Sequence, residues 1–327
     1  MQNIFDHEAF KLNSLTAAYN FSTPIETEVL DMFKVENVEG RTVMLVKSGH
    51  HLQVLMPGEI GQNPNVDTHD PEDAVPVSLI RYPFDSAIVP DDLTRIQSLK
   101  DKKVQAQELA TLVKSKMSKH RDNHRYTSAY TAYSALKGKI KNKKGTVIVN
   151  LHTVLGIVPR SLDLKLGTAT TDVPKLLQDL TKENRKLCKD YGHMMQKGTV
   201  VRIGSDFIFK VLTHAKVADF YGTELHPKML VSWADNPTQI KICGVTFIAD
   251  EVDEVVTEGA SYPIVDAGLF AMLRAPADVL SSGTSNRECY ITTKERDHDE
   301  GLEIRSRAIY LPIMRNPQLG CTISSSN

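Results

Sequence analysis

Cysteine and histidine side chains offer the first candidate chemistry, because a thiolate beside an imidazole base is a common nucleophile. Cys188 and His193 stand close together near the end of a helical pattern. Cys188, however, falls on the apolar side of that pattern with Leu180 and Leu187, and no third group that would orient a base lies nearby. A buried thiol is therefore the favoured interpretation, and no catalytic residue is predicted.

Metal coordination is the second candidate, since acidic and histidine residues gather in three places. These are the run 297–300, the pair at 50–51, and the set His214, Asp219 and His226. None has the ligand register of an EF-hand loop or an HExxH signature. Exposed turns are the favoured interpretation of the first two places. The sequence also lacks a GxxxxGK[ST] or GxGxxG run, so no metal and no cofactor is expected.

A basic helical segment with regularly spaced tyrosines is the third candidate. Its basic face is expected to run through Lys114, Lys116, Lys119, Arg121 and Arg125. Tyr126, Tyr130 and Tyr133 could stack on bases while neighbouring arginines contact phosphates. Their helical spacing is better explained as the packing stripe of a helix. A DNA-binding protein that uses this basic helix remains an alternative.

The charge of the chain is strongly polarised, although its net value is only -1. Residues 1–90 carry 5 Lys/Arg against 13 Asp/Glu, a balance of -8, and residues 91–144 carry 14 against 5, a balance of +9. Complementary potentials set orientation and register between proteins. We therefore expect the acidic front of one copy to lie on the basic part of a neighbour. Two ordinary solvated faces, or contact of the basic stretch with DNA, are the alternatives.

Composition places the chain among ordinary globular proteins, with 41% hydrophobic and 24% charged residues. Its 327 residues exceed what one core usually holds, so two domains are expected. Apolar runs fall far short of the ~20 residues that span a bilayer, and no signal peptide opens the chain. The four cysteines are predicted to be free thiols in a reducing cytoplasm.

The first ninety residues contain little that could fold alone. Residues 1–38 read as an arm without a compact element. Residues 41–56 form the clearest hairpin pattern, with a turn at 48–50, and a polar stretch at 57–74 leads to a return strand at 75–82. An isolated hairpin is marginal in water. This unit is therefore expected to pack on another chain or on a distant part of its own.

A long helix at 91–138 follows, with a break expected within 119–126 because ~1.5 Å per residue would make it unusually long. The remaining expected elements are a hairpin at 139–160, a helix at 173–191, a strand at 199–203, a helix or turn pair at 207–221, a strand at 240–248, and strands at 288–293 and 304–314 joined by a turn at 296–301. Helices and antiparallel strands without regular βαβ alternation predict an α+β fold.

Several short stretches, in their order and spacing, resemble one known family. They are Phe10-Lys-Leu-Asn-Ser-Leu-Thr-Ala-Ala-Tyr19, Ser134-Ala-Leu-Lys-Gly-Lys-Ile140, Gly244-Val-Thr-Phe247, Ala275-Pro-Ala-Asp278 and the closing segment 302–319. Together they are similar to the major capsid protein E family of tailed phages, the lambda-like shell proteins. The resemblance implies the Hong Kong 97-type capsid fold.

Placed on this sequence, the resemblance implies an N-terminal arm at 1–38 and an extended β-hairpin loop at 39–90. A peripheral domain with a long spine helix would comprise 91–155 and 284–327, and an axial domain 156–283. The residues expected at contacts between subunits are Arg41, Lys47, Glu59, Asp67, Asp70, Glu72, Asp73, Lys114, Lys116, Lys119, Arg121 and Arg125.

The function implied is that of a major capsid protein, which is not an enzyme. Copies would assemble as hexamers and pentamers into an icosahedral shell around double-stranded DNA, contacting the DNA non-specifically and no membrane. A scaffold protein, a portal and a decoration protein would be partners, and assembly in the host bacterial cytoplasm would yield the virion capsid. A cellular nanocompartment shell of the same fold, and an uncharacterised hydrolase, are further alternatives.

Overall fold

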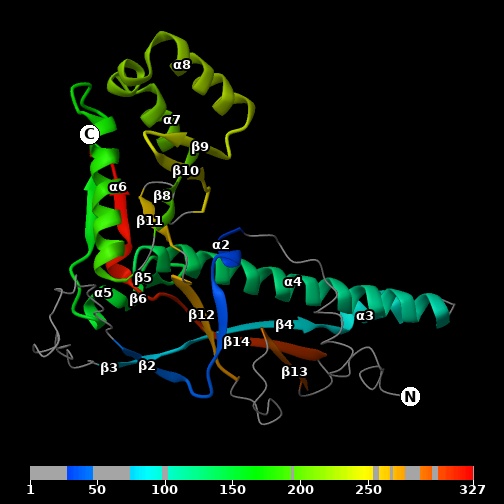
Figure 1. The fold of residues 1–327 in the computed structure, drawn as a ribbon. Helices are drawn as coiled ribbons and strands as arrows, with labels where there is room; N and C mark the ends of the chain where they lie inside the picture. Colours follow the sequence, from blue (N-terminus) through cyan, green and yellow to red (C-terminus); the bar gives the residue numbers. More distant parts are fainter. Residues whose placement is uncertain are drawn as a thin grey trace, which may run out of the picture. The chain divides into compact units, whose positions relative to one another are not determined.

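The computed structural model describes residues 28–46, 74–97, 102–192, 195–252, 258–265, 268–276, 288–296 and 301–326. The chain divides into two units (Figure 1). The first unit comprises Met1–Val43, Val77–Ala129 and Met272–Pro312, and the second comprises Met44–Pro76, Tyr130–Ala271 and Ile313–Asn327. The chain therefore passes between the units several times.

A five-stranded sheet forms most of the first unit. Its strands are β1 (Lys34–Asn37), β4 (Ile80–Ile88), β12 (Phe270–Arg274), β13 (Tyr290–Glu295) and β14 (Leu302–Met314). Strand β14 lies antiparallel between β4 and β13, with Leu302 opposite Ile88 and Arg307 opposite Tyr290. The expected pairing of the two C-terminal strands is confirmed.

The long helix α4 (Lys102–Leu136) runs without interruption through 119–126, so the expected break there is wrong. No glycine or proline occurs within α4, and sharp kinks usually need one of them or an inserted group. Leu109, Val113 and Met117 pack with residues of β4, β13 and β14 in one buried cluster. Gly138, expected to end the helix, adopts a φ of +68° just beyond it.

Two short helices and two small strand pairs accompany these elements. They are α2 (Glu28–Asp31), α3 (Pro90–Gln97), the pair β2 (Thr42–Val46) and β3 (Ala74–Ser78), and the pair β5 (Lys139–Lys141) and β6 (Val147–Asn150). The hairpin expected at 139–160 is present as β5 and β6, but α5 (Leu151–Val154) follows where we expected strand. The return strand expected at 75–82 is split between β3 and β4. The partner strand expected at 52–56 lies outside the described residues.

A six-stranded sheet forms the centre of the second unit. Its order is β7 (Arg160–Asp163), β15 (Cys321–Ser324), β11 (Gly259–Val265), β8 (Met195–Ile203), β10 (Val245–Ala249) and β9 (Gln239–Ile242). The single strand expected at 240–248 is wrong, because β9 and β10 form a hairpin. Cys243 and Gly244 have φ of 50° and 86°, which is the geometry of a two-residue turn that reverses the chain.

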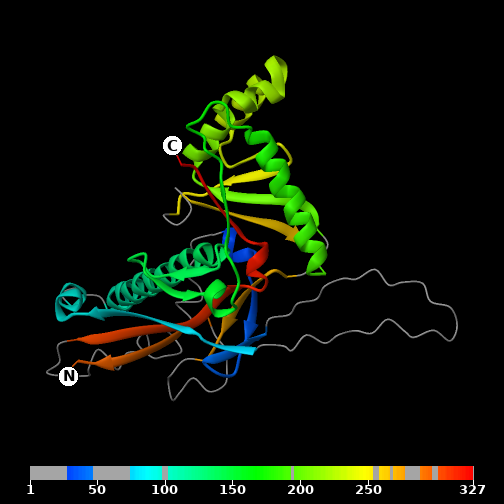
Figure 2. The same cartoon turned by 90° about the vertical axis from the view of Figure 1, so that its left-hand side faces the viewer.

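The helices of the second unit are α6 (Val173–Asp190), α7 (Ser205–Thr213) and α8 (Ala215–Asp235), with a 3₁₀ turn η4 (Pro317–Leu319). Helix α6 runs along the sheet (Figure 2) and is capped by Asp172, whose Oδ1 accepts from the Lys175 amide at 3.1 Å. The helix expected at 173–191 is thus confirmed. The helix or turn pair expected at 207–221 is α7 followed by the longer α8, which is interrupted at Gly222.

The core of the second unit lies between this sheet and its helices. Leu177, Ile208, Val211 and Phe247 are among its fully buried members, and the buried Trp233 packs with them. The α+β prediction is confirmed. None of the described helices is both long enough and apolar enough to cross a membrane.

Candidate functional site

Two histidines of α4 form a buried polar network with the sheet of the first unit. His120 Nε2 lies 2.6 Å from Ser86 Oγ on β4, and His120 Nδ1 lies 2.6 Å from Ser306 Oγ on β14. His124 Nε2 reaches the same Ser306 Oγ at 2.8 Å. Ser306 in turn donates to the carbonyl of Phe84 at 3.2 Å. The network ties the helix to two strands that are far apart in the sequence.

The donors and acceptors of this network can be assigned completely. Because the Ser306 hydroxyl donates to Phe84, its oxygen must accept from both imidazoles. His120 therefore carries its proton on Nδ1 and accepts the Ser86 hydroxyl at Nε2, while His124 donates through Nε2. This assignment accounts for all four contacts with both histidines neutral.

Burial also holds both histidines in the neutral form. Removal from water lowers the pKa of His120 to about 4; Asp85 opposes this, and the charges of Lys116 and Lys119 add to it. Burial, assisted by His120, lowers the pKa of His124 to about 4 as well. The helix–sheet contact therefore excludes an imidazolium at neutral pH.

The five basic residues expected on α4 differ in what they contact. Lys116 Nζ donates to the carbonyl of Ala87 at 3.1 Å and lies 3.7 Å from Asp92 Oδ2. Arg125 Nη1 lies 3.8 Å from Glu288 Oε1. These two side chains thus already interact within their own unit.

Lys114 and Lys119 are exposed, and Arg121 is half-buried with interactions inside the protein. Arg121 and Arg125 follow Lys114 by about two and three helical turns and share its side of α4, whereas Lys116 and Lys119 lie on another side. The expected single basic face is divided between two sides of the helix.

Most of the other residues expected at contacts between subunits lie outside the described residues. They are Lys47, Glu59, Asp67, Asp70, Glu72 and Asp73. Arg41 is exposed, and its carbonyl accepts from the Leu79 amide at 2.7 Å at the base of this segment. A role of these residues in contacts between subunits remains a prediction.

The tyrosines of α4 do not form one packing stripe. Tyr133 is buried and donates to Asp250 Oδ1 at 2.5 Å, and Tyr130 donates to the carbonyl of Asn142 at 3.2 Å. Tyr126 is 54% exposed, so its expected packing role is wrong.

The candidate nucleophile is buried, as favoured from the sequence. Cys188 is 1% exposed, and burial raises the pKa of its thiol to about 11. His193 lies outside the described residues, as do 50–51 and 297–300.

The remaining histidine set has structural partners. His214 donates to the carbonyl of Thr168 at 3.2 Å and His226 to that of Leu212 at 2.7 Å. Asp219 pairs with Lys216 at 3.6 Å. Among the residues that the structure describes, no three His, Cys, Asp or Glu side chains could hold a metal ion together.

A buried ion pair stabilises the second unit. Arg202 Nη1 donates to Asp250 Oδ2 at 2.8 Å and its Nε donates to the Tyr262 hydroxyl at 3.0 Å. The side chains of Arg202 and Asp250 are only 5% and 13% exposed. This network joins β8 and β11 to the segment after β10.

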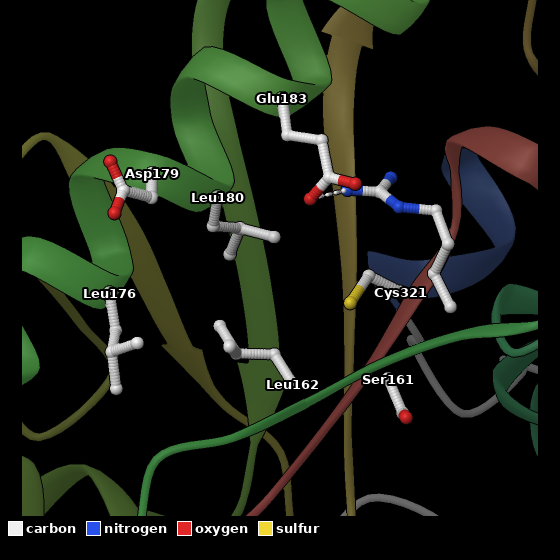
Figure 3. Close-up of a pocket in the computed structure, with 8 residues that line it drawn as sticks. Ser161, Leu162, Leu176, Asp179, Leu180, Glu183 and Cys321 are labelled. Carbon is white, nitrogen blue, oxygen red and sulfur yellow. Dashed lines mark ion pairs between the residues drawn. The ribbon is translucent and has the colours of Figure 1, made fainter.

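A small cavity of about 200 Å³ lies between α6, β7 and β15 (Figure 3). Arg160 Nη2 meets Glu183 at 2.9 Å at its edge, and Asp179 pairs with Lys182 at 3.4 Å. Burial raises the pKa of the lining Cys321 thiol to about 11. Both carboxylates at this cavity therefore take part in ion pairs.

The comparisons with known proteins decide the family. The model of the family described as phage major capsid protein E matches residues 11–324. The chain belongs to this family. It is also similar to the major capsid protein of Salmonella phage Felix O1, with 20% identity over 243 residues. That match covers 62% of this chain and 65% of the relative's length.

Solved structures of phage capsids share the fold of this chain. The fold is similar to the capsid subunit of cyanophage A-1(L), with a TM-score of 0.53, 13% identity and coverage of 91% and 92% of the two chains. It is also similar to the mature capsid subunit of bacteriophage PhiM1, with a TM-score of 0.52, 10% identity and coverage of 92% and 88%. The fold is therefore the Hong Kong 97-type capsid fold, and this family and fold are those of structural capsid proteins.

The network of His120, His124, Ser86 and Ser306 was not predicted from the sequence. A signal was present, because His120 and His124 continue the line of Val113 and Met117 at helical spacing. Their serine partners, Ser86 and Ser306, come from distant strands and carry no local pattern.

Proposed function

We propose that this protein is the major capsid protein of a tailed double-stranded DNA phage, assembling into the icosahedral shell that encloses the genome. The observation that carries the proposal is the family match over residues 11–324. It is supported by the structural similarity to the cyanophage capsid, which extends over more than nine-tenths of the chain. Hexamers and pentamers would be the building blocks, because closed symmetry terminates growth. The protein would act through contacts rather than catalysis.

The proposed organisation follows the family's fold. Residues 1–38 would be the arm and 39–90 the extended loop. The peripheral domain would be 91–155 with 284–327, and the axial domain 156–283. A scaffold protein, a portal and a decoration protein are the proposed partners, and packaged DNA would be contacted non-specifically. Assembly would take place in the host bacterial cytoplasm.

Subunit contacts are proposed to combine the acidic front of one copy with basic residues of another. Salt weakens the attraction between exposed charges, with a screening length of ~8 Å at physiological ionic strength. Assembly should therefore weaken as salt rises. Light scattering of assembling subunits at increasing NaCl concentration measures this, and assembly that does not respond to salt would remove the electrostatic part of the proposal.

Electron microscopy and size-exclusion light scattering of the purified chain test the function itself. Closed shells, tubes or rings of five or six subunits are expected. The contents of shells isolated from cells separate the proposed function from its alternative, because a phage shell encloses DNA and a nanocompartment encloses protein. A monomer that never assembles at high concentration and binds DNA would contradict the proposal and favour a DNA-binding protein.

A further inference from the structure

One short segment of the chain, residues 302–324, supplies an inner strand to each of the two large sheets. In the first unit, β14 pairs with β4 along one edge and with β13 along the other. In the second unit, β15 lies between β7, to which it is parallel, and β11, to which it is antiparallel. Among the described strands, β4, β13 and β7 have no other strand partner. Without this inner-strand segment neither sheet is continuous.

The core of the first unit depends on side chains of β14. Leu302 and Ile304 are buried in the cluster that receives the apolar side of α4. Ser306, also on β14, is fully buried and accepts hydrogen bonds from His120 and His124. A helix in a folded protein gains most of its stability from packing of this kind. Before β14 is present, the buried side of α4 therefore lacks the strand that it packs on.

The core of the second unit depends on β15 in the same way. Cys321 and Ile323 are 4% and 0% exposed and pack with residues of the surrounding helices and strands. Just beyond β15, the amide of Ser326 donates to Asp163 Oδ1 of β7 at 2.9 Å. Among the described strands, β7 joins the sheet only through β15. The inner-strand segment thus fills the second core and attaches an outer strand to it.

The position of β14 and β15 in their sheets matters because a chain is synthesised from its N-terminus. Every described helix and strand outside the inner-strand segment precedes residue 302. A last strand at the edge of a sheet could add to a sheet that has already formed. β14 and β15 lie inside their sheets, so their neighbours stay unpaired until the segment is made, and strands without a sheet are marginal in water.

We propose that the inner-strand segment controls when a chain becomes competent to assemble, because its arrival completes the fold of both units. A chain that has not been synthesised through residue 324 lacks both native sheets and therefore cannot join a shell. Incomplete chains with unpaired strands aggregate easily, and this order of folding keeps them out of the growing lattice. The proposal rests on the proposed function for the shell, whereas the completion of the fold concerns a single chain.

Two buried cysteines report the folding of the two units in ribosome-bound chains. Cys188 of the second unit and Cys289 of the first are 1% and 8% exposed. An unstructured linker of chosen length holds chains on the ribosome with either residues 1–300 or all 327 residues outside the exit tunnel. With 1–300 outside, both thiols should react with iodoacetamide as fast as in urea. With the whole chain outside, both should react more than about tenfold more slowly.

Mass spectrometry of the labelled chains decides between the outcomes. Protection of either thiol with only 1–300 outside would overturn the proposal, because that unit would have folded without its inner strand. Thiols that stay reactive when the whole chain is outside would also overturn it, because the segment would then not complete the fold.

A pair of variants in the full-length chain tests the insertion of β15 itself. Ile323→Asp places a carboxylate in the second core, so Cys188 should react at the rate of the unfolded chain. Thr322→Asp is the matched control, because the neighbouring residue of a strand points to the opposite face and Thr322 is only partly buried. Cys188 should remain protected in this control. Equal labelling of Cys188 in the two variants would contradict the proposal.

Recruitment to shells tests the consequence for assembly. Tagged full-length subunits that are assembling should pull down ribosomes that expose all 327 residues and should not pull down ribosomes that expose 1–300. Equal recovery of the two would overturn the control of assembly. A wild-type chain that forms no shell would contradict the proposed function, while the labelling of Cys188 and Cys289 would still decide whether the segment completes the fold.

Discussion

Lowering the pH from 7 to 5 is expected to destabilise the packing of α4 on β4 and β14, because His120 and His124 are neutral and buried there. The pKa of each falls from 6.5 to about 4 in the folded protein. Above pH 6.5 both histidines are neutral in the folded and in the unfolded chain, so the free energy of unfolding does not depend on their protonation. Between pH 6.5 and 4 the unfolded chain binds the protons first, so stability is lost as the pH falls.

The size of the loss follows from the same pKa values. Linkage gives about 2 kcal/mol per histidine at pH 5, or about 4 kcal/mol for His120 and His124 together. The nearby Asp85 does not contribute in this window, since its hydrogen bonds to Arg305 lower its pKa below 3.8. With a urea slope of about 3 kcal/mol per molar, the midpoint should fall by more than ~1 M.

Urea unfolding of the unassembled subunit, followed by circular dichroism at pH 7, 6 and 5, measures this loss. The variant His124→Gln is the matched comparison, because its amide can still donate to Ser306 but does not titrate. Its loss of stability between pH 7 and 5 should be smaller than that of the wild type by about 2 kcal/mol. Subtracting the loss of the variant from that of the wild type removes the contributions of the other histidines. These include His152, because burial also lowers its pKa.

Three results would refute this reasoning. One is a urea midpoint that is the same at pH 7 and 5. Another is a variant His124→Gln that loses as much stability as the wild type. The third is an NMR titration in which His120 and His124 take up protons near pH 6.5 in the folded subunit.

Three further perturbations test the packing inside each unit. Gly301→Ala should cost more than about 2 kcal/mol of stability, because at a φ of +116° its Cβ meets the backbone of β4. Gly145→Ala has open space around the new Cβ and a φ of +77°, so it should cost only about 1 kcal/mol. Equal urea midpoints for the two variants would contradict this. Arg202→Met should cost about 3–5 kcal/mol, because the buried Asp250 carboxylate loses its cation and keeps only the hydrogen bond from Tyr133. Adding Asp250→Leu should recover much of this loss in the same assay, and a double variant as unstable as the single one would speak against the pair. Burial raises the pKa of the Cys188 thiol to about 11, so at pH 8 it should react with iodoacetamide about 100-fold more slowly in the folded than in the unfolded chain. Mass spectrometry measures the labelling, and rapid labelling of the native protein would disprove the burial of this thiol.

The elements most readily predicted from the sequence were those with a local signal. Helix α6 has an aspartate cap, an apolar stripe and Gly192 beyond its end, and it forms where expected. The pairing of β13 with β14 follows from two β-rich segments around a polar turn. The family itself was recognisable because several short motifs occur in a fixed order along the chain.

Features that depend on tertiary context were missed or misjudged. The break in α4 was inferred from length alone, although packing of Val113 and Met117 on the sheet supports a long helix that isolation would not. The turn at Cys243 was overlooked, because a cysteine with positive φ is uncommon. The engagement of Lys116 with Asp92 could not be read from the sequence, since a charge pattern does not say which cations are already paired.

Cryo-electron microscopy of the particles formed by the purified chain tests the central claim most directly. We expect a closed icosahedral lattice of hexamers and pentamers in which each subunit has the fold described here, with α4 along the five-stranded sheet and the six-stranded sheet in its own unit. A soluble monomer under all conditions, or particles whose lattice density cannot accommodate this fold, would contradict the account.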